Sequence, residues 1–258
     1  EAVDLARQAL RLDPTGDPRS LRSLADQLAR TGRLDDEARS WYCLAVALPD
    51  EDPEGLAAAR RATELDAGYF AAWYQLAERL HERGDTSAAV RAVAAGAAAR
   101  PGDHYVQRTA ASKLRRFARP AEAEQYADRA VDLAPLDASM WVERVRVLGA
   151  AGRWDEAFAA AGTAAELAAA YPGETESDVA EWLRWLGLDL AEAGRHAEAV
   201  AVTTDAVEIY RRLAARDPDR FEPDLAAVSE SLDERSAALD RVARPGLLAR
   251  LVALLRNA

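Results

Sequence analysis

Cysteine, lysine and asparagine are nearly absent from this sequence, and their scarcity removes several kinds of site. Cys43 is the only cysteine among 258 residues, so the chain forms neither an intrachain disulfide nor a cysteine-based zinc site. Lys113 is the only lysine and Asn257 the only asparagine, so arginine supplies nearly all positive charge. We attribute this usage to a GC-rich genome. It restricts the side chains that can line a binding site.

Basic tracts and long apolar runs are missing as well. The net charge is −11 and no basic run is present, so we expect no nucleic-acid binding. The longest alanine-rich run, 157–171, is interrupted by Glu166 and is too short to span a bilayer. With no signal peptide visible, we expect a cytoplasmic protein without membrane contact. The sequence begins at Glu1 inside a helical pattern, and we expect it to be part of a longer protein.

Glycine and proline are few, whereas hydrophobic residues make up 50% of the chain and many of them are alanine. Alanine is the best helix former, and no apolar alternation of strand length occurs. The composition therefore predicts an all-α protein.

A period of 34 residues runs through the middle of the chain. The members of each recurring set lie 34 or 68 residues apart: Trp73 and Trp141; Gly84 and Gly152; Ala89, Ala123 and Ala157; Pro101 and Pro135. One period thus accounts for four residue types together, which indicates internal repeats.

Residues 70–103 show what one repeat contains. Apolar residues at helical spacing, Trp73, Leu76, Ala77 and Leu80, predict a first helix. Gly84 ends it, small residues mark the buried face of a second helix, and Pro101 closes that helix. This pattern resembles the tetratricopeptide repeat. Two positions depart from it: Gly96 stands where alanine is usual, and Gln107 where the next tryptophan would be.

The resemblance implies an all-α α–α superhelix, a right-handed solenoid of antiparallel helix pairs. Small residues at the pair interface allow close approach, and each pair buries its apolar face against the next. We predict one array over 1–258. Its expected parts are a second helix at 1–14, repeats at 18–50, 70–103, 104–137 and 138–171, a long-helix repeat at 174–218, and terminal helices or a cap at 219–258.

Three segments fit this division less simply. The helix at 53–65 follows an acidic loop, and its place within a pair stays open. After Gly152 the period lengthens to 42, and these longer repeats resemble those of kinesin-light-chain type. The last segment has an apolar stripe that either caps the array or forms a homo-oligomer contact: Leu247, Leu248, Leu251, Leu254 and Leu255.

No set of residues predicts catalysis. His196 and Glu198 have H-x-E spacing, but the zinc deaminase pattern also needs two further cysteines. In register, "AGRHAEA" corresponds to "AGRWDEA", so this stretch is a turn and a helix start. Carboxylate pairs such as Asp35–Asp36 and Glu51–Asp52 fall in turns and helix starts, as helix caps do. No phosphate loop, nucleophile elbow or histidine pair occurs, so we expect no enzyme, cofactor or metal.

The resemblance also implies a concave groove lined by first-helix positions. Carried over to this sequence, the candidate partner-binding residues are Tyr74, Glu78, Tyr105, Arg108, Ser112, Arg115, Arg146, Arg184 and Leu188. Arginine binds carboxylates through a two-pronged contact, and tyrosine supplies rigid contact area. The family's chaperone-tail clamp uses lysines and asparagines, which this chain lacks.

We therefore expect a protein-interaction scaffold that binds an acidic or C-terminal peptide. It would form the regulatory or sensing part of a larger bacterial signalling protein. Two alternatives remain open. The groove is an ordinary solvated face crossed by ion pairs such as Glu143–Arg146, or the array senses a small molecule or signalling peptide that changes its curvature.

Overall fold

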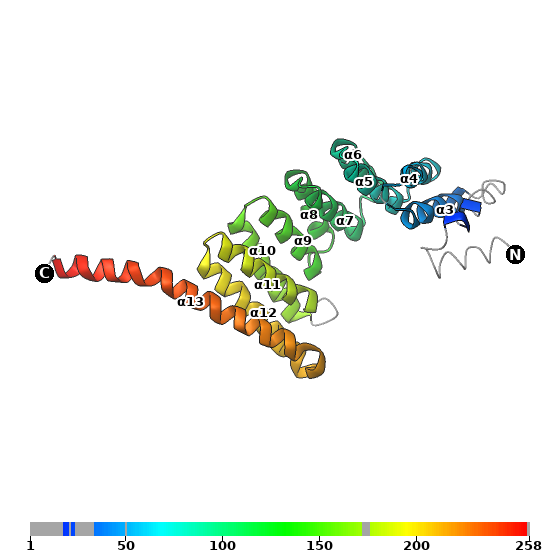
Figure 1. Cartoon of the computed structure of the whole chain (residues 1–258). Helices are drawn as coiled ribbons and strands as arrows, with labels where there is room; N and C mark the ends of the chain where they lie inside the picture. Colours follow the sequence, from blue (N-terminus) through cyan, green and yellow to red (C-terminus); the bar gives the residue numbers. More distant parts are fainter. Residues whose placement is uncertain (1–17, 21, 24–33, 50, 172–175, 257–258) are drawn as a thin grey trace. The chain divides into compact units, whose positions relative to one another are not determined.

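The computed structural model describes residues 18–20, 22–23, 34–49, 51–171 and 176–256, with side chains as far as Val242 in the last helix. Within these ranges the regular structure is helical and no strand occurs (Figure 1). The chain divides into two compact units, Glu1–Leu133 and Ala134–Ala258, which are described separately. Unit 1 and unit 2 denote them below.

From residue 34 on, the described part of unit 1 contains three antiparallel helix pairs. The helices are α3 (Leu34–Ala47), α4 (Pro53–Leu65), α5 (Phe70–Glu82), α6 (Thr86–Ala99), α7 (His104–Arg116) and α8 (Pro120–Leu133). Helix α3 packs on α4, α5 on α6 and α7 on α8, and each pair contacts the next. The helix at 53–65, whose place the sequence left open, thus lies between α3 and α5 in both sequence and contact.

The helices of unit 2 become longer along the chain. They are α9 (Ala138–Ala150), α10 (Trp154–Ala170), α11 (Glu176–Glu192), α12 (His196–Arg216) and α13 (Pro218–Arg256). Helix α9 packs on α10 and α11 on α12, and α13 runs beside α12 and continues past its end (Figure 1). Between Gly152 and Gly194 lie α10 and α11, with 17 residues each, whereas the preceding period holds α8 with 14 and α9 with 13, so each helix is about one turn longer. The step from a 34- to a 42-residue period is this lengthening of helices.

Small residues form the predicted interfaces. Ala89, Ala123 and Ala157 are fully buried. The glycine that departs from the repeat pattern has a steric reason, because a Cβ at Gly96 would lie 2.7 Å from the Tyr74 ring. The predicted fold class, an all-α α–α superhelix of antiparallel helix pairs, is confirmed within each unit.

The other departure, Gln107, takes over a hydrogen bond made by the tryptophans at its repeat position. The indole N–H of Trp73 donates to the Ala67 carbonyl at 3.0 Å, and that of Trp141 to the Pro135 carbonyl at 2.8 Å. The buried Gln107 amide donates to the carbonyls of Ala97 and Arg100 at 3.0 and 3.2 Å. The first helices α5, α7 and α9 are therefore each tied to the chain that precedes them by a side-chain hydrogen bond, from tryptophan in α5 and α9 and from glutamine in α7.

The turns inside the helix pairs share one backbone conformation. Gly84, Gly152 and Gly194 have φ angles of +81°, +72° and +77°, and Ala118 adopts 56° at the equivalent position. Glycine reaches this left-handed region without steric cost, whereas alanine does not. The turn geometry therefore persists where the sequence lacks the glycine signal.

A buried arginine fixes the end of α3. Arg79 on α5 is 0% exposed. Its guanidinium donates to the carbonyls of Leu48 at 2.7 Å and Pro49 at 2.9 Å, and also to that of Ala45. These groups are carbonyls at or just past the helix end, which lack helical partners. A Cβ at Gly55 would lie 2.4 Å from this guanidinium, so the glycine on α4 makes room for it.

Some sequence predictions fall outside the described residues. They are the helix at 1–14, most of 18–33 and the side chains of the C-terminal leucines. No helix in the part of the chain that was searched is both long and apolar enough to cross a membrane.

Candidate functional site: the first-helix faces

In unit 1 the candidate residues come from α5 and α7, which contact each other. Tyr105 is 51% exposed, and the Arg108 guanidinium lies 5.3 Å from its ring centroid. The Nε of Arg108 is buried and has no hydrogen-bond partner in the described structure. Ser112 and Arg115 lie further along α7 and are partly exposed. Helix α7 thus presents an aromatic ring stacked with a cation.

Tyr74 does not belong to this open face. It is 4% exposed, and its hydroxyl donates to the Val106 carbonyl at 2.7 Å. Burial raises the pKa of the phenol, with smaller contributions from Tyr126 and Asp103. Its ring fills the space left by Gly96, so the expected groove residue is a packing residue between α5, α6 and α7. The repeat pattern predicts that this first-helix position is exposed. Because Gly96 has no Cβ, the Tyr74 ring packs against α6 instead.

Glu78 forms a local ion-pair cluster. Its carboxylate accepts hydrogen bonds from Lys113 at 2.5 Å and Arg116 at 2.9 Å, both from α7. Since the carboxylate is already paired twice, it links α5 to α7 rather than offering a free negative charge. This is the pattern expected for a solvated face crossed by ion pairs.

In unit 2 the candidate residues come from α9 and α11. The Arg146 guanidinium lies 5.9 Å from the Trp182 ring centroid and forms an ion pair with Glu143 at 3.6 Å. The pair expected under the solvated-face alternative is therefore present. Arg184 stacks over Trp185 at 5.1 Å.

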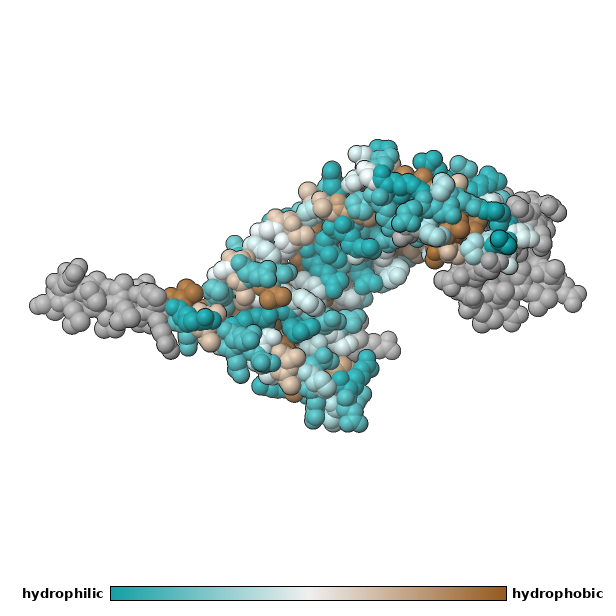
Figure 2. All heavy atoms as spheres, viewed as in Figure 1, coloured by the Kyte–Doolittle hydropathy of each residue, from teal (hydrophilic) through white to brown (hydrophobic). Residues whose placement is uncertain are grey.

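An exposed apolar strip accompanies Arg184 on α11. Trp185 is 50% exposed and Leu188 is 40% exposed. At 100° per residue, Leu188 falls one turn beyond Arg184 on the same side of the helix, with Trp185 next to them. On the face drawn in Figure 2 hydrophilic residues predominate and apolar ones are scattered.

Sequence reasoning missed two participants in this region. Trp185 lies one position away from those carried over from the family pattern, so it was not selected. Arg235 on α13 belongs to the segment treated as a cap, yet it is only 9% exposed and reaches α11. The sequence signal that could have indicated a close contact at α11 was Gly187, a glycine inside a long helix that the repeat pattern does not explain.

The H-x-E stretch forms a turn, as expected from its register. His196 begins α12, and Glu198 in its first turn pairs with Arg195 at 2.7 Å. Arg195 also reaches Asp155 at 2.5 Å. Among the residues that were searched, no group of three or more histidine, cysteine or acidic side chains is arranged to hold a metal ion.

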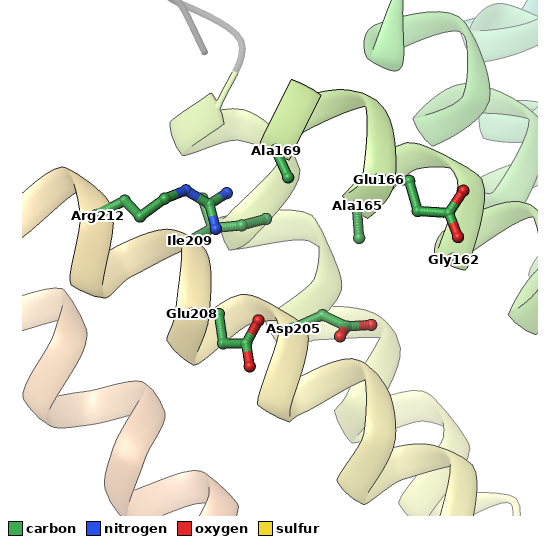
Figure 3. Close-up of a pocket in the computed structure, with 8 residues that line it drawn as sticks. All are labelled: Gly162, Ala165, Glu166, Ala169, Asp205, Glu208, Ile209 and Arg212. Carbon is green, nitrogen blue, oxygen red and sulfur yellow. The ribbon is translucent and has the colours of Figure 1, made fainter. Parts of the chain in front are cut away.

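A pocket of about 240 Å³ lies between the second helices α10 and α12 of unit 2 (Figure 3). Glu166 projects from α10, and Asp205 and Glu208 project from α12 on the opposite wall (Figure 3). Burial raises the pKa of Asp205, and the charges of Glu208 and Glu166 raise it further. Arg212 lines one end, and its Nη2 is buried without a hydrogen-bond partner in the described structure. Reasoning from first-helix positions could not find this pocket.

The fold and these faces define a helical-repeat protein of stacked antiparallel pairs. Residues 136–212 match the family model described as tetratricopeptide repeat. Over these residues the chain is similar to that family. The finer resemblance to kinesin-light-chain repeats is not confirmed. No curated protein matches the chain.

Several solved structures are similar in fold. A MamA fragment from Desulfovibrio magneticus RS-1 is 17% identical, with 77% of this chain and 98% of that chain covered and a TM-score of 0.46. YrrB, described as a TPR protein with an unusual peptide-binding site, is 19% identical, with 90% and 99% covered and a TM-score of 0.46. A structure of Naa15/Naa10 bound to HypK-THB is 17% identical, with 94% and 42% covered and a TM-score of 0.49.

Proposed function

We propose that this chain is a non-enzymatic protein-interaction scaffold that binds a peptide or protein segment on its first-helix faces. One observation supports this most directly. In each unit a first helix presents an exposed aromatic side chain stacked with an arginine, Tyr105 with Arg108 on α7 and Trp185 with Arg184 on α11. Tyrosine, tryptophan and arginine dominate the energetics of protein interfaces.

The proposed occupant is an acidic or C-terminal segment. The chain as a whole is acidic, whereas the first helix α7 carries Arg108, Lys113, Arg115 and Arg116 and no acidic residue, so its charge is opposite to that of the protein. Oppositely charged surfaces increase association rates and select partners. The proposed role is regulatory or sensing, within a larger bacterial protein.

The test is a comparison of two matched triple variants. Full-length protein is used to select binders from a displayed random peptide library, and affinities are measured by fluorescence polarisation. Replacing Arg108, Arg115 and Arg146 with alanine should weaken binding at least tenfold. The control removes the same charge from exposed arginines of second helices: Arg91, Arg129 and Arg211.

The control triple should bind within about twofold of the unchanged protein, apart from a small general electrostatic effect. Equal affinities for the two triple variants would show that the first-helix arginines do not form the binding face. Failure to select any peptide would count against the scaffold function itself.

The pocket between α10 and α12 favours a second candidate, a small-molecule sensor. It is a bounded hollow with a buried, unpartnered N–H at Arg212, whereas the first-helix faces are open. A ligand of the folded state raises its melting temperature by mass action. A thermal-shift screen of metabolites, repeated with Arg212→Ala, should show a shift that the variant loses. A screen without any such shift removes this candidate.

A further inference from the structure

The exposed side of α11 has apolar residues at its centre and acidic residues around them. Trp185 and Leu188 are 50% and 40% exposed. Arg184 stacks over Trp185 and brings one positive charge to the edge of this side. Exposed carboxylates lie at helical spacing beside the apolar pair: Asp178, Glu181, Asp189 and Glu192. These seven residues form the α11 face, whose net charge is negative.

The carboxylates of the α11 face are not balanced by basic side chains. Within the described ranges none of the four has an ion pair or a side-chain hydrogen bond. By contrast, Glu78 and Glu143 on the first helices α5 and α9 are paired with basic residues. Burial raises the pKa of Asp189, and the charge of Glu192 raises it further. A basic and apolar segment would therefore complement the α11 face in both charge and hydrophobicity.

The end of α13 extends past the helix on which α13 packs. Arg235 donates to the Thr203 hydroxyl at 2.6 Å, in a space left by Gly187, where a Cβ would lie 3.0 Å from the Arg235 Nη1. Helix α12 begins at His196, seven residues before Thr203. The antiparallel α13 therefore passes the end of α12 about seven residues after Arg235, near Val242, which is 60% exposed. Figure 1 shows α13 continuing beyond α12.

The sequence of this extension, residues 243–256, is basic and rich in leucine. It contains three arginines and no acidic residue, whereas the whole chain has a net charge of −11. Its leucines recur at helical spacing: Leu247, Leu248, Leu251, Leu254 and Leu255. At 1.5 Å per residue the extension is about 20 Å long, and the α11 face from Asp178 to Glu192 is about 21 Å long. The two segments thus match in length, apolar content and opposite charge.

We propose that two copies of this chain associate by placing the α13 extension of each copy on the α11 face of the other. This inference rests on the proposed binding of polypeptide segments to first-helix faces, and it names the segment that α11 receives. The leucines of the extension contact Trp185 and Leu188, and its arginines pair with the flanking carboxylates. Because each copy gives one extension and receives one, the assembly closes as a twofold dimer.

The course of α13 favours a second copy over the same copy as the source of the extension. Helix α13 is continuous from Pro218 to Arg256 and carries its end beyond α12 (Figure 1). The extension would reach α11 of its own copy only if the helix broke and reversed direction. A leucine-rich helix without any partner would instead leave a large apolar surface in water, which marks an interaction site in soluble proteins.

The experiment exchanges charges between the two segments and measures the dimer dissociation constant of the full chain by sedimentation velocity. Glu181→Arg with Asp189→Arg reverses charge on the α11 face and should raise this constant at least tenfold. Arg244→Glu with Arg250→Glu reverses charge on the extension and should raise it as much. All four substitutions in one chain should bring it back to within about threefold of the unchanged protein, because opposite charges meet again.

A matched control separates this contact from a general effect of net charge. Glu222→Arg with Glu230→Arg changes the net charge by the same amount at exposed positions of α13 and should leave the dissociation constant unchanged. Circular dichroism establishes that each variant folds. If the doubly reversed α11 face prevents folding, the milder pair Glu181→Gln with Asp189→Asn takes its place and should weaken the dimer by at least threefold.

Several results would overturn the inference: a chain that stays monomeric up to about 100 μM, a dimer that tolerates charge reversal on α11, or four substitutions that do not restore association. A dimer weakened only by the extension variant would indicate pairing of two α13 helices instead. The scaffold function fails separately. If the chain is monomeric but library-selected peptides bind through the arginines of α7, the scaffold stands and only the self-association is lost.

Discussion

Ala118 and the glycines at equivalent positions determine how much backbone strain the turn inside each of these helix pairs carries. The same left-handed conformation is adopted by Ala118 at φ 56° and by Gly152 at +72°. Because this position tolerates alanine, the glycine that marks the turn in the sequence is absent at Ala118, although the turn itself is present. Single residues therefore change the stability of the array without changing its architecture.

Exchanging these two residue types should move stability in opposite directions. Ala118→Gly should increase the free energy of unfolding by about 0.5–1 kcal/mol, because relief of left-handed strain exceeds the added entropy of the unfolded chain. Gly152→Ala should decrease it by about 1 kcal/mol. Urea denaturation followed by circular dichroism measures both. A loss of stability in Ala118→Gly would show that the backbone at this turn carries no such strain.

Gly55 offers a second test, of steric approach rather than backbone strain. Gly55→Ala would place a Cβ 2.4 Å from the buried Arg79 guanidinium, and we expect a loss of about 1–3 kcal/mol. Gly162→Ala is the matched control, since no heavy atom lies within 4 Å of its Cβ position in α10. It should be neutral or gain up to about 1 kcal/mol from helix propensity. Equal effects of the two would refute the packing argument.

At the scale of elements, an arginine–glutamate pair recurs where the second helix begins. Arg119–Glu122, Arg153–Glu156 and Arg195–Glu198 each join the residue just before the first turn to one within it. The negative charge also lies at the positive end of the helix dipole. The repeat period therefore reproduces an electrostatic cap as well as a packing position.

These pairs predict a contribution to acid sensitivity. Hydrogen bonds from the arginines lower the pKa of Glu122, Glu156 and Glu198. A lowered folded-state pKa means that the stabilisation is present above the ordinary glutamate pKa and disappears as the pH falls through the lowered value. The triple glutamine variant should be less stable at pH 7 and lose less stability on acidification to about pH 3.

Thermal unfolding at several pH values measures this difference. The control triple replaces exposed glutamates that have no ion pair in the described structure: Glu192, Glu222 and Glu230. Its stability should follow the pH dependence of the unchanged protein. Identical pH profiles for the two triple variants would show that the caps contribute no measurable stability.

At the scale of the whole molecule, contacts link each helix mainly to its neighbours along the chain. The stability of such arrays is approximately a sum of local terms and nearest-neighbour interfaces. The two compact units, Glu1–Leu133 and Ala134–Ala258, follow from this pattern. We therefore expect a local defect to have a local effect.

Hydrogen–deuterium exchange can test this locality. In Gly55→Ala the amides of α3, α4 and α5 should exchange faster, because Arg79 connects these helices, while those of α11 and α12 should keep their protection. Mass spectrometry of proteolytic fragments reads each helix separately. A uniform loss of protection across both units would indicate one cooperative structure instead.

The sequence predicted the fold more fully than the candidate site. Helix type, period and the buried alanines follow from spacing and propensity, which are local properties. Gln107 could be recognised as a departure, but its hydrogen bonds depend on a loop carbonyl that only the folded chain brings near. Tyr74 was expected to be exposed because first-helix position alone does not reveal that Gly96 receives its ring.

The sequence by itself determined an α-helical repeat with small residues between paired helices, since 3.6-residue periodicity and close packing are encoded at fixed spacing. The tertiary structure alone decided which charged groups are buried. Arg79 and Arg235 resemble other arginines in the sequence, yet both lie in the protein interior because Gly55 and Gly187, on other helices, leave room for them. Burial depends on neighbours distant along the chain, and that information appears only when the helices pack.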